Sequence, residues 1–290
     1  MRRYCSFLLS IALFAAALPA QAEPIKVVAT FSILGDLVRN VGGDNVAVTT
    51  LVGPDSDAHV YSPTPADAKK IADAKLIFVN GLGFEGWLPR LVQSSGSKAR
   101  IVTASNGIST LRLGSAADPH AWQSVNNAKI YVANIGAALA AADPAAAGQF
   151  AQNAQAYVEK LDALDREVRD AVAKLPPDRR KVISTHSAFG YFAASYGIEF
   201  IAPLGVSTES EPSARDIARI ITQVRRAKIP AVFLENVTDP RLMQRISAET
   251  GAKVGGTLYS DGLTGEKGDA PTYIDMVRHN IRALTRALGD

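Results

Sequence analysis

Three histidines and one aspartate stand out as side chains that could bind a metal ion: His59, His120, His186 and Asp261. The chain has four histidines in all, and these three lie in segments that look least like packed core. Imidazole nitrogens with one carboxylate form a ligand set that suits a borderline divalent cation such as zinc. If the fold brings the four side chains together, the sequence predicts a metal site.

Each of these residues also has an ordinary structural interpretation. His120 follows an Asp-Pro pair and could sit in a helix-capping turn, whereas His186 could be a buried histidine bonded to backbone. Asp261 precedes a glycine, and Asp-Gly is a common turn pair. The fourth histidine, His279, lies among polar and basic residues of the final helical stretch, where we expect it to face solvent.

Short apolar, β-branched runs alternate with amphipathic stretches, which predicts βαβ units and parallel sheets. The predicted strands are Lys26–Phe31, Ala47–Val52, Leu76–Asn80, Arg100–Thr103, Lys181–Thr185, Ile198–Ile201, Ala231–Glu235 and Lys253–Gly256. Between the two sets of four, apolar residues from Phe150 to Leu175 keep helical spacing. We therefore predict an α/β fold in which two domains, each with a mainly parallel four-stranded sheet flanked by helices, are joined by one long connecting helix.

Three of the four candidate ligands follow predicted strands. His186 comes directly after one strand, Asp261 follows the last strand, and His59 follows the second through a loop rich in Pro, Asp and Ser. Ligands of open parallel sheets bind beyond the carboxyl ends of the strands, and two candidates belong to each half, so we expect a site between the domains. Glu235 ends its own strand and is a candidate to hydrogen-bond a ligand from outside the coordination shell.

The first 22 residues predict a secretory signal peptide. Arg2 and Arg3 precede an apolar stretch that is too short to span a bilayer, and small residues around Ala22 offer a cleavage point. We therefore expect a periplasmic protein with domains at 23–143 and 176–290 and the connecting helix at 144–175. The only cysteine, Cys5, lies in the removed segment, so disulfides are excluded. The charged residues, 31 basic and 28 acidic, form no basic stripe for nucleic acid.

One glycine-rich segment imitates a nucleotide site. Residues 81–86 match G-x-G-x-x-G after a predicted strand, but a dinucleotide fold also needs an acidic residue at the end of the next strand. Residues 103–106, Thr-Ala-Ser-Asn, carry no carboxylate. The sequence also has no phosphate-binding G-x-x-x-x-G-K-[ST] loop and no G-x-S-x-G nucleophile motif. We therefore expect no nucleotide binding.

Several of these segments together resemble a known family, the cluster A-I solute-binding proteins, which are periplasmic metal-binding proteins of ABC importers for zinc and manganese. The matching segments are residues 28–37, the His59 loop, 80–88, 118–122, 185–192 and 259–263, in order along essentially the whole mature chain. The resemblance implies two α/β domains with the metal between them. It also implies His59, His120, His186 and Asp261 as ligands and a membrane permease as partner. We expect a monomer that is not an enzyme.

Zinc is the expected ion, because three nitrogens and one carboxylate suit it better than a hard, oxygen-preferring cation. Zinc-type members of the family usually carry histidine at the position of His186, where manganese-type members often carry glutamate. Manganese, or a mixture of the two, stays open as the alternative, because the chain lacks the histidine-rich loop of many zinc-uptake members. A zinc-dependent hydrolase is a more distant alternative, which a fourth protein ligand such as Asp261 would oppose. An organic chelate is another, since Tyr61, Trp122 and Tyr191 lie in the same segments.

Overall fold

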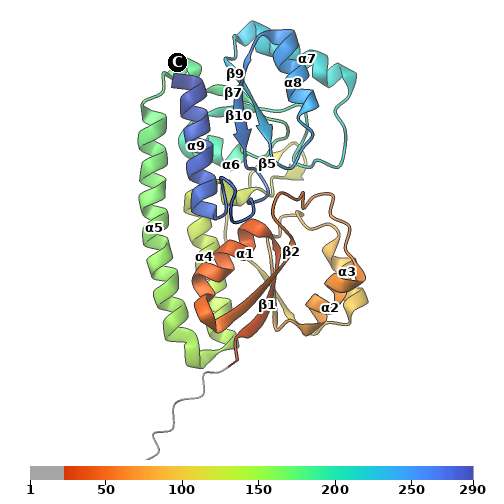
Figure 1. Ribbon diagram of the computed structural model, residues 1–290, viewed down its shortest axis with the longest axis vertical. Helices are drawn as coiled ribbons and strands as arrows, with labels where there is room; N and C mark the ends of the chain where they lie inside the picture. Colours follow the sequence, from red (N-terminus) through yellow and green to blue (C-terminus); the bar gives the residue numbers. More distant parts are fainter. Residues whose placement is uncertain (1–22, 290) are drawn as a thin grey trace, which may run out of the picture.

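Two separate parallel sheets form the two ends of the molecule in this computed structural model, which describes residues 23–289 (Figure 1). The predicted signal peptide lies outside the described residues. The first sheet has the order β2-β1-β3-β4, from Val46–Val52, Ile25–Phe31, Leu76–Val79 and Arg100–Thr103. The second has the order β10-β9-β7-β8, from Lys253–Leu258, Ala231–Glu235, Lys181–Ile183 and Glu199–Ile201. All pairs within both sheets are parallel, which confirms the predicted fold class.

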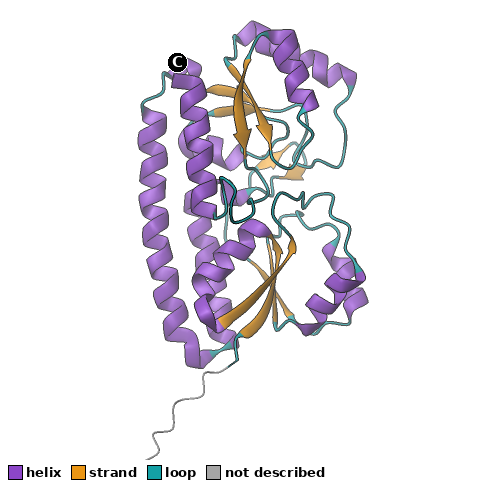
Figure 2. Cartoon of the chain, viewed as in Figure 1, coloured by secondary structure: helices purple, strands orange, loops and turns teal. Residues whose placement is uncertain are grey.

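Helices cover both faces of each sheet (Figure 2). The first domain contains α1 (Ser32–Gly42), α2 (Pro65–Asp73), α3 (Leu88–Ser95) and α4 (Val125–Ala142), and the second contains α6 (Gly190–Tyr196), α7 (Ala214–Ala227), α8 (Arg241–Thr250) and α9 (Tyr273–Gly289). Strand β1 is apolar along its length because both of its faces are buried. Val27 packs on the α1 and α4 side, while Val28 packs on the α2 and α3 side. A two-stranded antiparallel hairpin, β5 (Arg112–Leu113) with β6 (Ala116–Ala117), lies between β4 and α4 in sequence and was not predicted.

The long predicted helix is present as α5, Ala147–Ala173, entered through a 3-10 turn at Pro144–Ala146. Asp143 starts it by accepting hydrogen bonds from the amides of Ala145 and Ala146. At 1.5 Å per residue its 27 residues reach about 40 Å. The helix packs against α1 and α4 of the first domain and against α6 and α9 of the second, so it runs along both (Figure 1).

One hydrophobic core continues from the first domain into the second. Its largest fully buried members include Trp122, Tyr131, Phe189 and Tyr273, which come from both halves of the chain. This shared core and the single rigid connector restrict how freely the domains can move apart. None of the helices within residues 23–289 combines the length and the apolar character needed to cross a membrane.

Candidate metal centre

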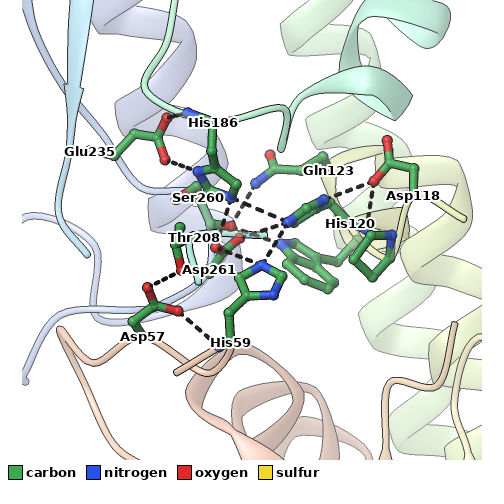
Figure 3. Close-up of polar contacts among 12 residues, drawn as sticks. Asp57, His59, Asp118, His120, Gln123, His186, Thr208, Glu235, Ser260 and Asp261 are labelled. Atoms are coloured by element: carbon green, nitrogen blue, oxygen red, sulfur yellow. Dashed lines mark hydrogen bonds and ion pairs between the residues drawn. The ribbon is translucent and has the colours of Figure 1, made fainter. Parts of the chain in front are cut away.

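The structure brings His59, His120, His186 and Asp261 together between the two domains (Figure 3). One ligand atom from each lies within 4.8 Å of the others, and all four side chains are buried. The Nε2 atom of His120 lies 3.2 Å from Nε2 of His59 and 3.3 Å from Nε2 of His186. The carboxylate of Asp261 lies 3.0 Å from His186 Nε2, 3.5 Å from His120 Nε2 and 3.6 Å from His59 Nε2.

These separations are those of a small tetrahedral shell. Two ligand atoms bound at 2.0–2.1 Å to one zinc ion with tetrahedral angles lie about 3.3 to 3.4 Å apart. Five of the distances between these ligand atoms run from 3.0 to 3.6 Å. The donor atoms are therefore gathered closely enough to surround a single cation, with all of them within 4.8 Å of one another.

Two of the imidazoles are oriented by carboxylates behind them. Asp118 Oδ1 lies 2.8 Å from His120 Nδ1 and also accepts the His120 amide at 3.0 Å. Glu235 Oε2 lies 2.5 Å from His186 Nδ1, while its Oε1 accepts the amides of Thr185 and His186 at 2.7 and 3.1 Å. A carboxylate at Nδ1 keeps a proton on that nitrogen, so that Nε2 is the ring atom that would bind a cation.

His59 is held differently. Its backbone amide donates to Asp57 Oδ1 at 2.8 Å, and its ring stands edge-on to Phe84 with the centroids 4.8 Å apart. Asp57 reaches the second domain with its other oxygen, which accepts the Thr208 hydroxyl at 2.6 Å. The loop that carries the first histidine is therefore tied to the opposite domain beside the site.

The buried carboxylate of Asp261 lacks hydrogen-bond donors of its own within residues 23–289. The residue is fully buried, and no described residue donates a hydrogen bond of good geometry to either oxygen. A buried polar atom without a partner costs about 1–3 kcal/mol, more when it is charged. A bound cation among the three imidazoles would coordinate one of these oxygens and balance the buried charge, so this carboxylate is the strongest structural indication of a metal site.

The backbone around this carboxylate is fixed by the first domain. Trp122 Nε1 and Gln123 Nε2 both donate to the carbonyl of Ser260, at 2.9 and 2.7 Å. The amide of Leu263 donates to Ser32 Oγ at 2.9 Å. The fourth candidate ligand thus belongs to the second domain in sequence, but residues of the first domain place it.

The pKa values of the site differ from one residue to the next. Burial lowers the pKa of His59 to about 4, which keeps its ring neutral. Burial also opposes the charged form of His186, but the carboxylates of Glu235 and Asp261 outweigh it and raise the pKa of this histidine well above 6.5. Burial opposes ionisation of Asp261 as well, yet the nearby imidazoles hold its pKa below the usual range. His186 Nε2 and Asp261 Oδ2, which lie 3.0 Å apart, thus each favour the charged form of the other.

The sequence missed three features of this region. Asp118 and Asp57 both stand two residues before a histidine and accept its amide, and this shared Asp-x-His spacing is a signal that could have found them. His279 was expected to face solvent, which is wrong: it is half-buried, its Nε2 lies 3.0 Å from the Thr257 carbonyl, and its ring packs against Tyr259. The contact exists because β10 and α9 pack together, which the local sequence does not reveal.

Comparison with known proteins gives a consistent assignment. Residues 27–287 match the family described as zinc-uptake complex component A, periplasmic. The chain is 36% identical over 272 residues to the iron-binding protein YfeA of Yersinia pestis, covering 92% of this chain and 88% of that protein. It is 34% identical over 299 residues to the manganese-binding lipoprotein MntA of Halalkalibacterium halodurans, covering 99% of both.

Solved structures agree with these relatives. The periplasmic zinc-binding protein TroA of Treponema pallidum superposes with a TM-score of 0.87 at 32% identity, covering 92% of this chain and 99% of that one. A manganese-bound periplasmic metal-binding protein of Candidatus Liberibacter asiaticus gives a TM-score of 0.83 at 33% identity, covering 90% and 98%.

Two parallel α/β domains around a buried His and Asp cluster, on one long helix, define a metal-binding substrate-binding protein of an ABC importer. The chain belongs to the zinc-uptake complex component A family.

Proposed function

We propose that this protein captures zinc in the periplasm and delivers it to the membrane permease of an ABC importer. The observation that carries the proposal is the buried carboxylate of Asp261, which has no hydrogen-bond partner among the described residues and faces three imidazole nitrogens. A cation at their centre would turn a costly arrangement into a stable one. In this proposal His59, His120, His186 and Asp261 are the ligands.

Four protein ligands favour capture over catalysis. A catalytic zinc site has three protein ligands and keeps its fourth position for water. Here Asp261 lies within 3.6 Å of all three imidazole Nε2 atoms, so it occupies the position that a hydrolase would leave to water. The family to which the chain belongs consists of transport proteins rather than enzymes.

The donor set supports zinc over manganese. Three nitrogens and one carboxylate oxygen in a small shell suit zinc, whereas manganese prefers more oxygen ligands. Relatives of this chain are named for zinc, manganese or iron, so the preference rests on the site and not on their names. Manganese is the alternative cargo of the same site.

Residues 1–22 act in this proposal as a signal peptide that is cleaved on export. The released chain works as a monomer with domains at 23–143 and 176–290 around the helix at 144–175. Zinc leaves when the loop of Asp261 separates from the first domain. That step breaks the hydrogen bonds of Ser260 and Leu263 with Trp122, Gln123 and Ser32.

Native mass spectrometry of the protein purified from the periplasm, with elemental analysis, tests the cargo. We expect one zinc ion per chain and, in chelator competition, zinc binding at least about 100-fold tighter than manganese binding, following the order of metal affinities at such sites. The variant His279→Gln is a matched control, because it removes the one histidine outside the site and should leave zinc affinity unchanged. If the purified protein carries manganese in place of zinc, the alternative cargo is favoured. If it carries no metal and does not bind added zinc, the proposed function is refuted.

A further inference from the structure

The glycine-rich segment after β3 contacts both ligand loops of the first domain. We call residues Asn80–Trp87 the anchor loop. At its start, Asn80 Nδ2 donates to the carbonyl of Pro119 at 2.9 Å, and at its end Trp87 Nε1 donates to the carbonyl of Ala58 at 2.9 Å. Pro119 and Ala58 are the residues immediately before His120 and His59. One loop therefore holds the backbone on the N-terminal side of each of these two histidines.

An aromatic ring of the anchor loop, that of Phe84, packs beside the candidate ligands. Phe84 is buried, stands edge-on to the ring of His59 at a centroid distance of 4.8 Å and packs on Trp122 at 5.0 Å. Trp122 in turn lies 5.3 Å from the ring of His120. The anchor loop thus fixes the backbone before each histidine and also limits the tilt of both imidazoles.

A buried carboxylate gives the anchor loop its shape. Glu85 accepts the Asn80 amide at 2.6 Å, the Gly81 amide at 3.1 Å and the Thr30 hydroxyl at 2.7 Å. Glu235 accepts two consecutive amides after β7 in the same way, and there the second amide belongs to His186. Strands β3 and β7 hold the same position, third across their sheets. In each sheet one glutamate, Glu85 or Glu235, fixes the backbone that follows the carboxyl end of that strand.

The glycines of the loop serve its conformation. Gly81, Leu82 and Gly83 have φ angles of 83°, 57° and 84°, a left-handed run that favours glycine. A Cβ atom on Gly81 would also lie 2.5 Å from Thr103 Cγ2. This tight turn explains the G-x-G-x-x-G match. It agrees with the lack of the acidic residue that a dinucleotide site would also need.

We propose that the anchor loop is a positioning element that sets the separation of His59 and His120 before the metal arrives, with Trp87 as the residue that holds His59. The inference rests on the proposed function. The two Nε2 atoms lie 3.2 Å apart although they come from segments 61 residues apart in the sequence. The backbone contacts from Asn80 and Trp87 hold the two loops at this spacing when no ion is bound, and such preorganisation increases affinity.

The test is zinc affinity and the visible spectrum of the cobalt-substituted protein for Trp87→Phe. Phenylalanine keeps a ring against Tyr61 but cannot donate to the Ala58 carbonyl. We expect zinc Kd to rise by about 3- to 10-fold, the range of one lost hydrogen bond, and the cobalt d–d bands to change as His59 shifts. The control Asn134→Ala removes side-chain hydrogen bonds to the carbonyls of Ala104 and Asn106, in a loop without ligands, and should leave both readouts unchanged.

A double-mutant cycle separates positioning from general loosening of the domain. In a His59→Ala background, Trp87→Phe should weaken zinc binding by less than about twofold, because its effect passes through His59. An equal loss in both backgrounds, or a Trp87→Phe protein with parental Kd and parental cobalt bands, would overturn the inference while leaving the proposed function intact. Failure of the parent protein to bind zinc would overturn both.

Discussion

Thr208 of the second domain donates its hydroxyl hydrogen to Asp57 Oδ2 at 2.6 Å, while Asp57 Oδ1 accepts the amide of His59 at 2.8 Å. This single aspartate connects the loop of the first candidate ligand to the opposite domain. Both residues also line a surface hollow beside the site, together with Thr185 and Ser210. The bond holds the two domains together at the edge of the site.

Thr208→Val should therefore release zinc faster. Valine has the same shape but cannot donate, and the loss of one hydrogen bond of about 0.5–1.5 kcal/mol predicts an off-rate about 2- to 10-fold higher. The on-rate should change little, because the bond forms only when the loops are closed. Stopped-flow release into a chelator measures the off-rate. Ser210→Ala, in the same hollow, is the control, and equal off-rates for the two variants would contradict this role.

Asp261→Asn should weaken zinc binding by at least about 100-fold, more than the loss caused by residues outside the coordination shell. Asparagine keeps the size of the side chain and removes its charge, so a change reflects coordination rather than packing. Competition titration against a chelator of known affinity gives the Kd. Asp269→Asn, on the surface of the same loop region, should bind like the parent. Parental affinity in Asp261→Asn would remove this residue from the ligand set.

Glu235→Gln should reduce zinc affinity by about 10- to 100-fold without removing a ligand. The carboxylate accepts two backbone amides and fixes the proton on His186 Nδ1, whereas an amide can accept with one oxygen alone. Isothermal titration with zinc measures the loss. Glu199→Gln, an exposed glutamate that pairs with Lys181 at the surface, is the matched control. A loss of thermal stability with unchanged affinity would show that Glu235 supports the fold and not the site.

Zinc binding near pH 7.5 should release about one proton, which comes from His186. The two carboxylates beside His186 raise its pKa well above 6.5 in the metal-free protein, despite its burial, and coordination through Nε2 requires that proton to leave. The pKa of His59, about 4 because of burial, makes no contribution in this range. Titration calorimetry in buffers of different ionisation enthalpy counts the protons, and a count of zero would contradict the prediction.

The raised pKa of His186 also predicts how the stability of the metal-free protein changes with pH. A histidine with a raised pKa stabilises the metal-free fold fully below pH 6.5, and this contribution is lost as pH rises through the raised value. Zinc competes with that proton, so the increase in Tm that zinc produces should be larger at pH 8 than at pH 6. Thermal denaturation with and without zinc at both pH values measures it. A zinc-induced increase in Tm that is larger at pH 6 than at pH 8 would contradict the raised pKa of His186.

Much of the architecture was predictable because it depends on local periodicity. The runs at 100–103 and 231–235 became strands with the predicted bounds, and the apolar spacing from Phe150 to Val172 became the buried stripe of α5. The candidate ligands were predictable by residue type, since three of the four histidines lie in segments that look least like packed core.

The sequence by itself determined which side chains could bind a metal and which segments would form the sheets and the connecting helix. The tertiary structure decided what holds those side chains in place: Asp57 shared with Thr208, and the Trp87 contact to the loop of His59. The physical reason is range. Periodicity and turn chemistry act over a few neighbouring residues, whereas these hydrogen bonds join segments that become neighbours only when the sheets, α4 and α5 have packed.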